Sequence, residues 1–123
     1  MFYHELKSKT WITKDNKPYF VLDLNAFKVQ LLLYGLSHRG FYDYEFTLDD
    51  FPTDFEPLTL PKFNVGDQVL YRRIRHDTLN HVKREIVTII KVDEHDELVK
   101  YVIRDNEHNV PWALAIEVEP INY

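Results

Sequence analysis

The chain has 123 residues, a formal net charge of -5 at pH 7 and no cysteine. Its length fits one domain, or one small module with an ordered extension, and 45% hydrophobic residues with only 3 glycines exclude a disordered chain. The absence of cysteine excludes disulfides and thiolate zinc sites and fits a reducing compartment. We find neither the apolar core of a signal peptide nor a run long enough to span a bilayer. We therefore predict a cytoplasmic protein that does not contact a membrane.

The N-terminal segment predicts a β-hairpin. Two strand-like runs, 10–13 (TWIT) and 18–24 (PYFVLDL), flank the polar residues 14–17. Asp15 and Asn16 are residue types that favour a two-residue hairpin turn. The chain is therefore expected to reverse direction at these two residues.

The next segment predicts a helix over residues 26–34 (AFKVQLLLY). Asp23 or Asn25 is a suitable N-cap, and Gly35 is well placed as the residue that follows the helix. The apolar positions recur at helical spacing and share one face. They are Phe27, Leu31 and Tyr34. We expect this helix to pack on the core and to have no further role.

Residues 41–57, here called the acidic segment, contain six acids, six aromatic residues and no cation. Residues 42–48 alternate between apolar and polar types and predict a half-buried strand. Three prolines in 49–61 predict an extended or looped arm. Carboxylates can imitate a phosphate chain, and phenyl rings can insert into a partner's pockets. The predicted protein-binding residues are Asp43, Glu45, Asp49, Asp50, Phe51, Asp54, Phe55 and Glu56. In the alternative interpretation, the rings pack the arm onto the barrel and the acids face water.

The second half of the chain predicts an all-β module. Strands are expected near 68–75, 85–92, 98–104 and 112–118, joined by charged or Asn- and Asp-rich turns. On strand 85–92, the even-numbered positions are the more apolar. In the closing segment one face is expected to point into the core. It consists of Val110, Trp112, Leu114, Ile116 and Val118.

The segment FNVGDQVLYR at 63–72 resembles the first strand of SH3-like small barrels, the group that includes Tudor and KOW modules. Val65, Gly66, Asp67 and Val69 match the opening of that motif. The resemblance covers about half the chain and implies a binding module rather than a chemistry, with the partner left open. It departs from the group at residues 82–85, where a glycine is usual before the second strand. Tudor-type recognition needs an aromatic cage, to which Tyr71, Tyr101 and Trp112 are the available candidates.

Basic residues gather at the facing ends of the first two strands of this half. If these strands pair, their cations meet at the tip of a hairpin and form a candidate surface for nucleic acid or an acidic protein. The predicted nucleic-acid-binding residues are Arg72, Arg73, Arg75, Lys83 and Arg84. In the alternative interpretation, this is an ordinary charged hairpin end that resists edge-to-edge pairing.

The sequence contains no motif for catalysis or for a cofactor. There is no G-x-S-x-G, no P-loop and no G-x-G-x-x-G pattern. The six histidines do not have the spacing of a zinc site, and the acidic turn at 93–97 lacks the central glycine of an EF-hand loop. We therefore expect no enzyme activity, no metal and no cofactor.

These patterns together predict a single α+β domain. A hairpin, a helix and the acidic arm (1–61) are expected to pack as one unit with an SH3-like barrel (62–123). The chain is short, free of cysteine and rich in Tyr, Asp and Lys, and in this it resembles bacteriophage or mobile-element accessory proteins. We predict a non-enzymatic protein-binding module, of the inhibitor or adaptor type, that acts on a host protein. The alternative is a nucleic-acid-binding SH3-like module that uses the basic hairpin.

Overall fold

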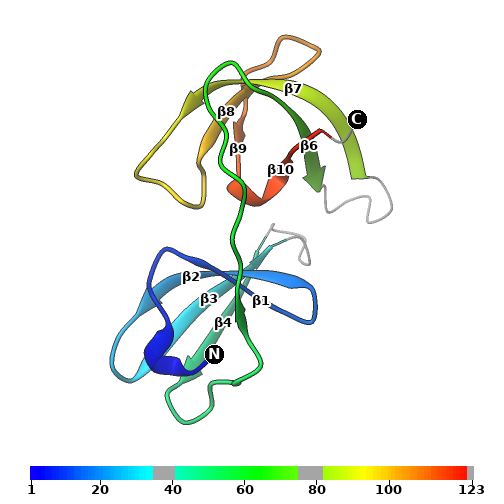
Figure 1. Ribbon diagram of the computed structural model, residues 1–123. Helices are drawn as coiled ribbons and strands as arrows, with labels where there is room; N and C mark the ends of the chain where they lie inside the picture. The colour runs from blue at the N-terminus through cyan, green and yellow to red at the C-terminus, as the bar shows by residue number, and fades with distance from the viewer. Residues whose placement is uncertain (35–40, 75–81, 122–123) are drawn as a thin grey trace. The chain divides into compact units, whose positions relative to one another are not determined.

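The computed structural model describes residues 1–34, 41–74 and 82–121. Within these ranges the chain is nearly all β, with strands in two antiparallel sheets and two 3₁₀-helices of three residues each. The predicted α+β class is therefore wrong. The chain divides into two compact units, Met1–Thr59 and Leu60–Tyr123, each with its own sheet (Figure 1).

The first unit is a five-stranded antiparallel sheet in the order β4-β3-β2-β1-β5. A short 3₁₀-helix, η1 (Tyr3–Glu5), precedes the first strand. The strands are β1 (Trp11–Lys14), β2 (Lys17–Leu24), β3 (Lys28–Tyr34), β4 (Phe41–Thr47) and β5 (Glu56–Pro57). The first four strands follow one another in the sheet as in the sequence, and β5 returns to pair with β1 at the other edge.

The predicted β-hairpin at Asp15-Asn16 is confirmed. β1 and β2 pair in register from Trp11↔Phe20 to Lys14↔Lys17, so the loop between them has two residues. Asp15 and Asn16 have φ angles of 53° and 62°. Positive φ at both loop positions is what the right-handed twist of a two-residue hairpin requires, and Asp and Asn tolerate it better than most residues.

The predicted helix over 26–34 is wrong, because these residues enter strand β3. Asn25 caps a turn instead of a helix: its side-chain Oδ1 accepts hydrogen bonds from the backbone N–H groups of Phe27 (2.8 Å) and Lys28 (3.0 Å). Phe27 is 77% exposed and Leu31 is fully buried, so they do not share a face. Short apolar runs such as residues 31–33 fit a buried strand as well as a helix. Gly35 lies outside the described residues.

The core of the first unit includes the two phenyl rings of the acidic segment. Phe51 and Phe55 are 8% and 1% exposed, and their rings stack with centroids 5.2 Å apart. Phe55 also makes an edge contact with Tyr19 on β2, at 5.1 Å. The other buried residues of this core are Leu6, Ile12, Val21, Val29 and Leu31. The loop between β4 and β5 is therefore packed into the first unit by its aromatic residues.

The second unit is a five-stranded antiparallel sheet in the order β10-β6-β7-β8-β9. It curls into a half-barrel (Figure 1). A 3₁₀-helix, η2 (Ala115–Glu117), separates the last two strands. The strands are β6 (Gln68–Ile74), β7 (Val82–Val92), β8 (Tyr101–Arg104), β9 (Trp112–Ala113) and β10 (Val118–Glu119).

A tight turn at Gly66-Asp67 leads into β6. Gly66 has a φ of +94°, a conformation that costs energy for any residue with a Cβ atom. The Asp67 carboxylate accepts a hydrogen bond from the Asn64 N–H at 2.8 Å, which closes the turn. Two residues on, Val69 is completely buried in the core of this unit.

On the second strand the more apolar, even-numbered positions are not the buried ones, and the predicted core face of the closing segment is wrong in part. On β7 the buried residues are Val87 and Ile89, and a β-bulge between Ile89 and Lys91 then shifts the alternation. In the closing segment Trp112 is 52% exposed and the small Ala113 and Ala115 are buried, whereas Val118 is buried in the core as predicted. The helix η2 breaks this segment, so a continuous alternation does not apply to it.

Candidate binding surface on the second unit

β6 and β7 pair as the predicted hairpin, and their pairing brings basic residues directly opposite one another. Arg72 is opposite Arg84, and Arg73 is opposite Lys83. Like charges at directly opposed positions destabilise a sheet. Arg75, the fifth predicted nucleic-acid-binding residue, lies outside the described residues. The four described residues thus form two consecutive pairs of cations at the end of the hairpin.

The register assigns the Arg72–Arg84 pair to the face of the sheet opposite its core. Val69 and Val87 are opposite each other and buried, so the residues that alternate with them point to the other side. Arg84 is exposed and Arg72 is half-buried. We call this side the outer face; its residues on β6, β7 and β8 are Gln68, Leu70, Arg72, Arg84, Ile86, Thr88, Lys91, Val102 and Arg104.

Arg104 is the residue of this surface that the sequence interpretation missed. Thr88 is opposite Gln68 on one side and opposite Arg104 on the other, so Arg104 joins the same face through the β7–β8 pairing. It is exposed. Arg104 could be assigned to this face only from the pairing of β8 with β7, which no local sequence motif reveals.

The outer face contains three arginines, Arg72, Arg84 and Arg104. Within the described ranges, none of the ion pairs involves Arg72, Arg84 or Arg104. The pairs that do occur there involve lysines: Lys14 with Asp15 and Asp54, Lys28 with Glu45, and Lys100 with Glu97. Glu119 on β10 is opposite Leu70, and it brings one carboxylate to the edge of this face.

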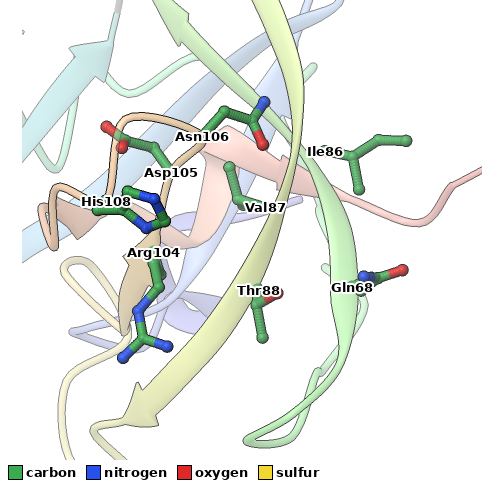
Figure 2. A pocket seen from close by; sticks show the side chains of 8 residues that line it. All are labelled: Gln68, Ile86, Val87, Thr88, Arg104, Asp105, Asn106 and His108. Atoms are coloured by element: carbon green, nitrogen blue, oxygen red, sulfur yellow. The ribbon is translucent and has the colours of Figure 1, made fainter.

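A hollow of about 450 Å³ lies beside Arg104 (Figure 2). One wall comes from β6 and β7 and the other from the end of β8 and the turn that follows it. The lining residues are Gln68, Ile86, Val87, Thr88, Arg104, Asp105, Asn106 and His108. Polar side chains therefore dominate the hollow, and Ile86, which is 48% exposed, adds an apolar surface.

Hydrogen bonds fix the turn that forms one wall of this hollow. The Asp105 carboxylate accepts from the backbone N–H groups of Glu107 and Asn109, both at 2.9 Å. The Asn106 side-chain amide donates to the Glu85 carboxylate at 3.2 Å. Since the Asp105 carboxylate already accepts hydrogen bonds from its own backbone, its negative charge is partly satisfied, whereas the Arg104 side chain beside it is exposed.

The predicted protein-binding residues of the first unit separate into two groups. Their carboxylates are all exposed; they belong to Asp43, Glu45, Asp49, Asp50, Asp54 and Glu56. Two of them contact lysines, Glu45 with Lys28 at 3.6 Å and Asp54 with Lys14 at 3.9 Å. Phe51 and Phe55 are buried in the core and present no ring for insertion into a partner.

The aromatic residues considered for a cage do not come together. Tyr71 and Tyr101 are 4% and 1% exposed, while Trp112 is on the outer face. Burial raises the pKa of the Tyr101 phenol above its ordinary value. In the part of the chain that the structure describes, no group of three His, Asp or Glu side chains could hold a metal ion, and no helix is long and apolar enough to cross a membrane.

Comparison with family models, with curated proteins and with solved structures found no match to this chain. The function must therefore be argued from the geometry and charge of the two units.

Proposed function

We propose that the protein is a non-enzymatic binding module and that the outer face of its second unit binds the phosphate backbone of a nucleic acid. The observation that carries this proposal is the set of three arginines on one face, Arg72, Arg84 and Arg104, without an ion-pair partner among the described residues. Arginine binds phosphate through two parallel hydrogen bonds, so such a face suits a polyanion.

The pairing of like charges supports the same proposal. Arg72 opposite Arg84 lowers the stability of the hairpin when no anion is bound. A bound phosphate chain would neutralise both side chains and release the counterions condensed on the nucleic acid, which is the main source of affinity in such complexes. The net charge of -5 weakens long-range attraction but leaves this local face positive.

We also infer that the second unit is an SH3-like module. Its strand order, β10-β6-β7-β8-β9, and the 3₁₀-helix before the last strand support this inference. The Gly66-Asp67 turn before β6 supports it too. Gly66 adopts the left-handed conformation and the Asp67 carboxylate closes the turn, so both residues of the SH3-like motif are used to begin the strand.

The test is the binding of fluorescently labelled oligonucleotides by the full chain, with Arg84→Glu as the main variant. We expect this variant to lose about tenfold or more in affinity, since one phosphate contact is replaced by a repulsion. Lys17→Glu is the matched control. Lys17 is opposite Lys14 in the β1–β2 hairpin of the first unit, so both variants place a glutamate opposite a cation and change the charge equally. The proposal would be contradicted if both variants lost the same affinity for oligonucleotides, or if neither lost any.

The second candidate function is protein binding through the carboxylates of the first unit, as in a small inhibitor or adaptor. One observation favours it: the stacked Phe51 and Phe55 rings hold the β4–β5 loop in place, so its carboxylates are presented in a fixed arrangement. Its test is a pull-down after nuclease treatment with wild type and with Asp49→Lys plus Asp50→Lys. A stoichiometric protein that only the wild type retains would support this function.

A further inference from the structure

We infer that Trp112 and Lys91 form a stacking site for an unpaired base, so that the preferred ligand of the second unit is single-stranded nucleic acid. This inference rests on the proposed function and narrows its ligand class. It starts from a feature that phosphate binding does not need: a large aromatic side chain on the same face as the arginines, with 52% of its surface exposed.

The β-bulge in β7 is what brings the two side chains together. Ile89 is opposite Ile103, but Lys91 rather than Ile90 is opposite Val102, so one extra residue is accommodated. Without this shift Lys91 would follow Val87 and Ile89 toward the core. Val102 in turn is opposite Trp112 on β9. Lys91 and Trp112 therefore flank Val102 on the outer face.

The local contacts leave the indole ring available. The Lys91 Nζ lies 5.5 Å from the centroid of the Trp112 ring, at the distance of a cation–π contact. Val102 is 9% exposed beneath them and supports the pair from the sheet. Two residues before Trp112, Val110 is another exposed apolar side chain, at 54%. An ammonium beside an exposed ring can contact the phosphate of the nucleotide whose base stacks on that ring.

This stacking site is continuous with the arginine surface. Val102 and Arg104 are two residues apart on β8, which separates them by about 7 Å along the strand on the same face. Arg104 lines the hollow together with residues of β6 and β7, the two strands that contain Arg72 and Arg84. Alternation of an aromatic ring with cations along one surface is the pattern of proteins that bind single strands. In a duplex the bases stack on each other and are not available to this ring.

The experiment uses intrinsic fluorescence, because the chain has two tryptophans in contrasting environments. Trp11 is 6% exposed in the first unit and Trp112 is 52% exposed. The full chain is titrated with an oligothymidylate of about 12 nucleotides, with a duplex of the same length and with polyglutamate. We expect the oligothymidylate to quench the fluorescence and to bind more tightly than the duplex, and polyglutamate to cause no quenching.

Two variants separate stacking from charge. Trp112→Ala should lose at least about fivefold in affinity for the oligothymidylate. Trp112→Phe should keep most of the affinity, since phenylalanine also stacks, but should lose the quenching because only the buried Trp11 remains. Both substitutions are at an exposed position of a two-residue edge strand, so the fold is expected to tolerate them.

The outcomes distinguish this inference from the proposed function. Binding that depends on Arg84 but shows no quenching, or equal affinity for strand and duplex, would overturn the stacking site and leave phosphate binding intact. Quenching by polyglutamate equal to that by the oligothymidylate would also overturn it, because polyglutamate has no base. Absence of binding to every nucleic acid at low salt would overturn both.

Discussion

At the scale of single residues, one side chain determines how the first sheet continues after β2. Asn25 Oδ1 accepts two backbone hydrogen bonds, and the Asn25 N–H donates to the Lys28 carbonyl at 3.1 Å. These bonds close the turn that returns the chain as β3. The same chemistry, a short polar side chain bonded to N–H groups two and three residues later, also begins helices.

We predict that Asn25→Ala lowers the free energy of unfolding by about 1 kcal/mol, because two backbone N–H groups lose their acceptor. Asn25→Asp keeps an oxygen at this position and should stay close to wild type. Urea unfolding followed by circular dichroism measures both. An alanine variant as stable as wild type would show that the turn does not depend on this side chain.

Tyr101 is expected to make the second unit less stable at alkaline pH. The phenol is 1% exposed, its Oη accepts the Phe63 N–H at 3.3 Å, and burial raises its pKa above the ordinary value of about 10. The folded state therefore holds the proton more tightly than the unfolded state. This contribution is intact below about pH 10 and is lost as the pH rises from there through the folded pKa.

We predict how Tyr101→Phe changes this pH dependence, measured by urea unfolding of the variant and of wild type. The measurements run from about pH 8 to about pH 11, from two units below to one unit above the ordinary tyrosine pKa. The variant should show a weaker decline in stability above pH 10. Tyr3 and Tyr19, whose pKa values burial also raises, lie in the first unit, where a decline of the same kind is expected in both proteins. An equally steep decline in the variant would mean that Tyr101 ionises equally in both states.

At the scale of elements, the β4–β5 loop is held by its aromatic residues together with hydrogen bonds that the N-terminal amine donates to the Thr53 and Phe55 carbonyls. Phe55→Ala removes a ring that is 1% exposed and packs on Phe51 and Tyr19, so it should cost about 3–5 kcal/mol. Asp54→Ala next to it is exposed and should change the stability by less than about 1 kcal/mol, since its contact with Lys14 is at the surface. Thermal unfolding checks both, and similar effects would contradict this packing.

The β6–β7 hairpin allows binding and stability to be changed in opposite directions. Arg84→Glu places a carboxylate opposite Arg72 and replaces a repulsive pair by an attractive one, a gain of about 0.2–1 kcal/mol. The variant should therefore unfold at a slightly higher urea concentration while it loses affinity for oligonucleotides. A variant that loses both would show that its binding defect comes from damage to the fold.

Local sequence patterns predicted the elements whose determinants are local. The hairpin at Asp15-Asn16 and the pairing of the two basic strands were found because turn residues and alternation are enough to define them. The helix at 26–34 was wrong because an Asn turn and a short leucine run are compatible with both structures. The bulge at Ile90 puts Lys91 on the face opposite Val87 and Ile89, and the helix η2 separates the exposed Trp112 from the buried Val118. A period-two pattern cannot anticipate such an extra residue or helix.

The candidate site was predicted only in part for a similar reason. Arg72 and Arg84 are close to each other in a hairpin, so their proximity follows from the sequence. Arg104 reaches the same face through a third strand, and Trp112 through a fourth, after a long connection. Conversely, Phe51 and Phe55 resembled exposed anchors because an aromatic residue among acids has the same sequence pattern whether it is buried or exposed.

At the scale of the whole molecule, 20 acids against 15 basic residues oppose the approach of a polyanion, while the proposed function requires the outer face to attract it. These two effects have different ranges. Repulsion by dispersed surface carboxylates extends over the Debye length, about 30 Å at 0.01 M salt and about 10 Å at 0.1 M. Contacts between arginines and phosphates act at hydrogen-bond distance and persist when the long-range field is screened.

This difference predicts a curved salt dependence. Between about 0.1 and 0.3 M salt, four cations on the outer face should give a slope of about -2 to -3 in a plot of log affinity against log salt, at about 0.7 per phosphate on a single strand. They are Arg72, Arg84, Arg104 and Lys91. Below about 0.05 M the plot should flatten, because the repulsion then reaches the ligand. A slope near zero would contradict phosphate binding, and a slope steeper than about -5 would require more cations than this face supplies.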